Sequence, residues 1–75
     1  MDELKEVFIN EIKDGKAIIK LPFGKFFNYY KEATGKLGLS TFYGFLRENI
    51  SLGLIKKGRK GFYFIDLSKY IQKGD

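Results

Sequence analysis

The chain has 75 residues, no cysteine and no histidine, and a formal net charge of +5. These absences exclude disulfides, zinc sites of the usual kind and catalysis by a Cys or His nucleophile or base, so we expect no enzyme activity, no metal and no cofactor. Eight Phe and five Tyr can supply the core of one small domain by packing alone.

Charge is distributed unevenly along the chain. Residues 1–15 hold five acids and two lysines, whereas residues 16–75 hold twelve cations and four acids. The pattern predicts one acidic and one basic face and favours a polyanionic partner, although a Lys-rich surface also serves solubility. The acidic N-terminus lacks a cationic leader, and no apolar run approaches the ~18–20 residues of a spanning helix, which indicates a cytoplasmic protein.

The first elements are a helix and a short strand. Residues 2–14 carry apolar side chains at spacings of three and four, with Asp2 as a possible N-cap and Gly15 as the stop. These apolar residues are Leu4, Val7, Phe8 and Ile12. Residues 17–21, AIIKL, are too short for a helix and rich in branched side chains, so we expect a strand closed by Pro22.

Two further helices follow. The second is predicted at residues 23–34 and ends at Gly35; its apolar side carries Phe26, Phe27, Tyr30 and Ala33. After a tight connection the third runs from a cap at Ser40 or Thr41 to about Leu52. At 100° per residue, its apolar side carries Phe42, Phe45, Leu46 and Ile50.

The last elements are a hairpin and a short tail. Gly53 closes the third helix, and the segments 54–57 and 62–66 flank the turn 58–61, whose glycines can supply positive φ angles. Period two places Phe62 and Phe64 on one face and Tyr63 and Ile65 on the other, and one of these faces should be core. The tail 68–75 predicts one or two helical turns that use Leu67, Tyr70 and Ile71.

This order of elements resembles the winged helix-turn-helix family over residues 2–67. The resemblance is carried above all by the block LGLSTFYGFLRENISLGLIKKGRKGFYFID, where the third helix passes directly into a charged wing. In size and in Lys and aromatic content the chain is similar to small regulators of archaeal plasmids and viruses. The resemblance implies an α+β domain at 1–67 followed by a tail at 68–75, with the order α-β-α-α-β-β. It also implies a sequence-specific transcription regulator that binds double-stranded DNA as a homodimer.

In that family the third helix enters the major groove. The candidates for base readout here are Ser40, Thr41, Tyr43, Gly44, Arg47, Glu48 and Ser51. Arg47 is expected to read a base, because a guanidinium can donate two hydrogen bonds to guanine, although it could instead pair with a neighbouring acid. Gly44 costs a helix about 0.8–1 kcal/mol, so it either thins the outward face or allows close packing against the second helix.

The wing is expected to contact the DNA backbone or the minor groove. Its candidates are Lys56, Lys57, Arg59 and Lys60, and secondary candidates on the second helix and its turn are Lys25, Asn28, Lys31, Thr34 and Lys36. Cations at a hairpin tip can also discourage sheet aggregation. Dimer contacts are expected from the first helix and residues 67–71, because Tyr70 and Ile71 have no evident place in a three-helix core.

Two other functions remain open. The basic face could dock an acidic partner, as in a winged-helix interaction module of replication or transcription machinery. Alternatively, the aromatics that interleave with cations at residues 62–64 could stack on the bases of RNA or single-stranded DNA.

Overall fold

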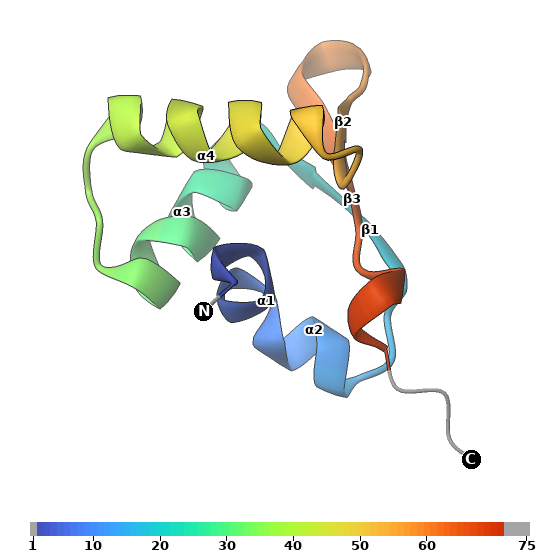
Figure 1. The fold of residues 1–75 in the computed structure, drawn as a ribbon. Helices are drawn as coiled ribbons and strands as arrows, with labels where there is room; N and C mark the ends of the chain where they lie inside the picture. Colours follow the sequence, from blue (N-terminus) through green and yellow to red (C-terminus); the bar gives the residue numbers. More distant parts are fainter. Residues whose placement is uncertain (1, 72–75) are drawn as a thin grey trace.

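The helices pack on one face of a three-stranded antiparallel sheet, as Figure 1 shows for the computed structural model, which describes residues 2–71. Within these residues the fold is α+β, with four helices and the strand order β1-β3-β2. The elements are α1 (Glu3–Val7), α2 (Ile9–Lys13), β1 (Ile18–Pro22), α3 (Phe23–Thr34), α4 (Leu39–Ser51), β2 (Ile55–Lys57), η1 (Arg59–Gly61), β3 (Phe62–Asp66) and η2 (Ser68–Tyr70).

The first predicted helix is broken at Phe8, so the prediction of one continuous helix is wrong. The Asp2 carboxylate accepts a hydrogen bond from the backbone N–H of Leu4 at 3.2 Å, which confirms the N-cap. Phe8 leaves the helical conformation (φ −116°, ψ 30°), and its fully buried ring lies 5.4 Å, centroid to centroid, from both Phe26 and Tyr29. Burial of this ring therefore accompanies the change of direction between α1 and α2.

Helix α3 has the predicted bounds, whereas α4 begins earlier than predicted. Gly35 ends α3 in the left-handed conformation (φ 74°). Gly38 is the N-cap residue of α4 and has an extended backbone, so neither Ser40 nor Thr41 is the cap. Both hydroxyl-bearing residues lie in the first turn, where their side chains are exposed.

The buried face of α4 differs from the predicted one at a single position. Phe42, Phe45 and Leu46 are buried as expected, but Ile50 is 43% exposed and Asn49 is buried in its place. Asn49 lies four residues after Phe45, and its side-chain amide donates to the Phe45 carbonyl at 2.9 Å. The helical angle therefore decides the buried position, and the hydrogen bond offsets the cost of burying an amide.

The central strand β3 gives the sheet two chemically distinct faces. Its Tyr63 and Ile65 are buried beneath the helices, which confirms that one of the two alternating faces is core. The inner face is completed by Leu21 of β1 and Ile55 of β2. Phe64, on the other face, is 40% exposed.

The segment after β3 folds back onto the helices, so the expectation that Tyr70 has no place in the core is wrong. Leu67 is fully buried, Tyr70 packs against the core from η2, and the Tyr70 hydroxyl donates to the Asp2 carboxylate. Both side chains therefore contribute to the packing of the single chain. The remainder of the expected tail, residues 72–75, lies outside the described residues.

The contact between Tyr70 and Asp2 predicts pH-dependent stability. The hydrogen bond from Tyr70 holds the pKa of the Asp2 carboxyl below its usual range. A lowered folded-state pKa stabilises the fold above the unfolded pKa, about 3.9, and this contribution is lost as the pH falls below it. We expect Tyr70→Phe to lower the free energy of unfolding at neutral pH, because the hydrogen bond is lost. The loss should be only about 1 kcal/mol, because the Asp2 side chain is 42% exposed.

Urea unfolding of the wild type and of Tyr70→Phe at neutral pH and at pH 3 measures this difference. The difference should shrink at the lower pH, because the Asp2 carboxyl of the unfolded chain is largely protonated there. An undiminished difference at pH 3 contradicts the assignment to the Asp2 carboxylate.

Candidate nucleic-acid interface

The outward face of α4 carries a polar strip opposite its buried face. Ser40, Arg47 and Ser51 are exposed along this strip, and Gly44 lies between them. Tyr43 borders one side; it is 46% exposed, and its ring centroid is 5.8 Å from that of Phe23. The other side carries Thr41 and Glu48, and Glu48 lines a shallow groove shared with Lys36 and the start of α1.

Arg47 has an exposed guanidinium that makes no ion pair with any carboxylate of residues 2–71. The ion pairs within this range join Lys36 to Glu3 and Lys69 to Asp2. The alternative of a helical arginine that is neutralised by a neighbouring acid is therefore not supported. All of its donors can serve a ligand.

Gly44 occupies open space. A Cβ atom built at this position meets no heavy atom within 4 Å beyond the glycine's own surroundings. The close-packing explanation is therefore wrong: no neighbouring side chain of the described chain requires a glycine here. What remains is the thinned outward surface, which would let another molecule approach the helix backbone.

The wing presents four exposed cations: Lys56, Lys57, Arg59 and Lys60. Its positive φ angles belong to Lys60 (58°) and Gly61 (76°), so the expectation that both glycines of the turn supply them is wrong for Gly58. At Gly58 the constraint is steric, because a Cβ there would lie 2.7 Å from the Phe64 ring. Lys60 adopts the left-handed conformation within the turn, so one of the four cations lies at the tip of the hairpin.

The secondary phosphate candidates fall into two groups. Lys25 and Asn28 are exposed on α3. The Lys31 ammonium lies 4.6 Å from the centroid of the Phe27 ring, and the Thr34 hydroxyl uses its proton in a 2.7 Å hydrogen bond to the Tyr30 carbonyl. Thr34 is therefore not a free donor.

Lys36 is also engaged within the chain. Its ammonium lies 2.5 Å from a Glu3 carboxylate oxygen, and this hydrogen bond raises the pKa of Lys36. The pair neutralises a cation that sequence reasoning assigned to phosphate. A phosphate could bind the Lys36 ammonium only by displacing the Glu3 carboxylate.

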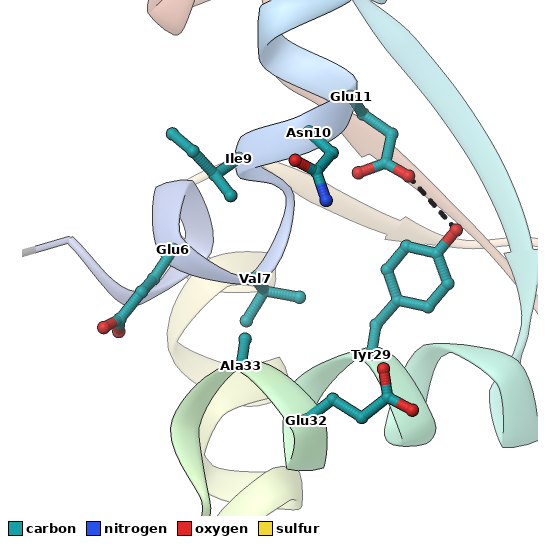
Figure 2. Close-up of a pocket in the computed structure, with 8 residues that line it drawn as sticks. All are labelled: Glu6, Val7, Ile9, Asn10, Glu11, Tyr29, Glu32 and Ala33. Carbon is teal, nitrogen blue, oxygen red and sulfur yellow. Dashed lines mark hydrogen bonds between the residues drawn. The ribbon is translucent and has the colours of Figure 1, made fainter.

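The groove between α1, α2 and α3 has the wrong charge for a polyanion. Figure 2 shows it, with a volume of about 600 Å³, and its acidic side chains are Glu6, Glu11 and Glu32. Tyr29 donates to Glu11 at 3.1 Å, and burial together with this contact raises the pKa of the phenol. A polyanion would therefore be repelled from this groove.

Lys20 is a cation that sequence reasoning left out of the site. It lies on the outer face of β1, with its ammonium 4.9 Å from the centroid of the Phe62 ring. Period-two alternation in AIIKL already separates Lys20 from Leu21 and Ile19 and could have identified it. Its proximity to the rings of β3 depends on the strand order.

Comparisons with known proteins give no independent assignment: no family model, no curated protein and no solved structure matches the chain. Among residues 2–71, no helix is long and apolar enough to cross a membrane. The same residues contain no cluster of three acidic side chains placed to hold a metal ion.

The open site at Gly44 predicts that Gly44→Ala stabilises the fold. Alanine favours an α-helix over glycine by about 1 kcal/mol, and no steric cost opposes it here. Thermal and urea unfolding should show this increase. A loss of stability would mean that a methyl group at position 44 clashes with its surroundings. Gly24→Ala, at another open helical glycine, is the matched control.

Proposed function

We propose that this protein binds double-stranded DNA as a winged helix-turn-helix transcription regulator. Helix α4 lies in the major groove and the wing, residues 56–61, contacts the backbone or the minor groove. The proposal is carried mainly by one observation. Gly44 is a helical glycine that no neighbouring group of the described chain requires, and it lies in the same outward strip as the unpaired Arg47. Close approach of a ligand to the outward strip would account for a glycine that lowers helix stability at this position without serving packing.

The arrangement of elements supports the proposal. α4 leads through Gly53 into the antiparallel pair β2 and β3, and β1 adds to the far side of β3. This topology resembles that of winged helices, in which one short strand joins the sheet ahead of the helix-turn-helix. In Figure 1, α4 and the hairpin lie at the top of the molecule, with α1 and α2 below.

Electrostatics support the same docking direction. Exposed cations cluster on the wing, whereas the acids of α1 and α2 line a groove beneath. A polyanion is attracted to one side and repelled from the other, which fixes orientation during encounter.

A homodimer on two half-sites is part of the proposal, because one short module offers few contacts. Leu67 is buried and Tyr70 packs against the core, so Ile71 and the first-helix region remain of the expected surfaces. Ile9 of α2, which is 36% exposed, is its largest exposed apolar side chain.

Substitution of Arg47 tests base readout. Selection from a duplex library should yield a discrete site, and Arg47→Ala should weaken binding to that site about 5- to 150-fold, because a bidentate contact is worth about 1–3 kcal/mol. Binding to random duplex should change much less. Lys13→Gln, at an exposed cation of α2, is the matched charge control, and equal losses on selected and random duplex would contradict base readout.

The wing is tested by the salt dependence of duplex binding. Lys57→Gln with Arg59→Gln and Lys60→Asn removes three charges, and asparagine tolerates the left-handed conformation at position 60. Each lost phosphate contact should reduce the slope of log K against log salt by about 0.9. An unchanged slope in fluorescence anisotropy titrations would remove the wing from the interface.

A further inference from the structure

The outer face of the sheet forms a second surface, separate from α4. Antiparallel pairing places Lys20 of β1 and Lys56 of β2 directly opposite Phe64 of β3, one on each side. Side chains in such a row are neighbours, because paired Cβ atoms lie about 4.5–5.5 Å apart. On this face of the sheet, the Phe64 ring therefore lies between two cations.

A second ring extends this row. The Lys20 ammonium lies 4.9 Å from the centroid of the Phe62 ring and 5.6 Å from that of Phe64. Phe64 is nevertheless 40% exposed, and Phe62 is partly exposed. An exposed contact between an ammonium and a ring is weak, so Lys20 can exchange it for a phosphate without disturbing the fold.

The Phe64 ring is held in place by the wing. A Cβ built at Gly58 would approach the ring edge to 2.7 Å, so the ring lies close to the Gly58 backbone. Gly58 in turn donates its backbone N–H to the Phe62 carbonyl at 2.7 Å, so the ring rests on hydrogen-bonded backbone. A ring positioned in this way presents a flat apolar surface at little further cost in side-chain entropy.

The charge around the rings is favourable to an anion. Lys20 and Lys56 form no ion pair with the acids of residues 2–71. Asp66 is the acid of β3 on this face, and one of its carboxylate oxygens accepts hydrogen bonds from the Ser68 N–H and hydroxyl. The wing cations continue from Lys56 along the same hairpin.

We propose that this face binds single-stranded nucleic acid, with a base stacked on Phe64 and the flanking phosphates held by Lys20 and Lys56. Unpaired bases stack on exposed aromatic rings, and cations beside the rings follow the backbone. Bases of a duplex are stacked on one another, so the surface selects unpaired strands. This activity shares Lys56 with the proposed wing contact to duplex, but it does not use α4 and does not rest on the binding of duplex.

The experiment compares oligomers of about 15 nucleotides that differ only in their bases and sugars. Fluorescence anisotropy of the full chain is measured with oligothymidine, oligouridine and an abasic oligomer of equal length and charge. The base-bearing oligomers should bind more tightly than the abasic one. Tighter binding of oligothymidine or of oligouridine supports the site and identifies its ligand as DNA or RNA, respectively. Equal affinity for all three oligomers overturns the proposal.

Variants at Phe64 locate the effect. Phe64→Leu should weaken binding of the base-bearing oligomers about 5- to 150-fold, the range expected for loss of one stacked base, while Phe64→Tyr keeps the ring and the affinity. The exposure of Phe64 lets both variants fold, which the thermal midpoint checks. Undiminished binding by a folded Phe64→Leu overturns the assignment.

A fluorescent reporter gives a direct readout of stacking. The chain contains five tyrosines but no tryptophan, so Phe64→Trp supplies a single tryptophan at the site, which can be excited selectively at wavelengths that tyrosine does not absorb. Its emission should be quenched by oligothymidine and not by the abasic oligomer; quenching by both, or by neither, contradicts stacking. Arg47→Ala should reduce duplex affinity and leave strand binding unchanged, so the two proposals can fail separately.

Discussion

The packing of Phe42 between α3 and α4 is the interaction on which the rest of the structure depends. Its buried ring lies 5.3 Å from Phe26, 4.9 Å from Phe27 and 5.1 Å from Tyr30, measured between centroids. Aromatic pairs of this kind add about 0.5–1.5 kcal/mol each beyond the burial of their area, in a chain that has no disulfide. The same packing fixes the rotation of α4 about its axis. The outward positions of Gly44 and Arg47 are therefore consequences of the core.

The sheet connects this core to the wing. Tyr63 of β3 lies 6.0 Å from Phe26, centroid to centroid, and β3 pairs with both other strands. Because side chains alternate along β3, the burial of Tyr63 and Ile65 places Phe64 on the opposite face. One strand thus supplies the core, positions the basic hairpin beside α4 and supports an aromatic surface.

Electrostatics separate the cations that fold the chain from those that a ligand can use. Lys36 pairs with Glu3, and Lys69 and Tyr70 both approach Asp2, so charges near the start of α1 are partly neutralised within the domain. The wing cations make no such pairs with the described acids, and their charge remains available to a polyanion. The prediction of a basic surface thus applies to the wing more than to Lys36.

Sequence by itself determined the elements and most of the core, because Pro22, Gly35 and Gly53 are local signals and a helical or alternating period acts over a few residues. It also identified the α4 strip and the wing as candidate surfaces. Only tertiary structure decided that the chain bends at Phe8, that Lys36 is paired and that Lys20 lies beside Phe62. The hydrogen bond from Lys36 to Glu3 spans 33 positions of the sequence, and the one from Tyr70 to Asp2 spans 68. Such contacts form only when distant elements pack together, and no local pattern encodes which side chains then meet.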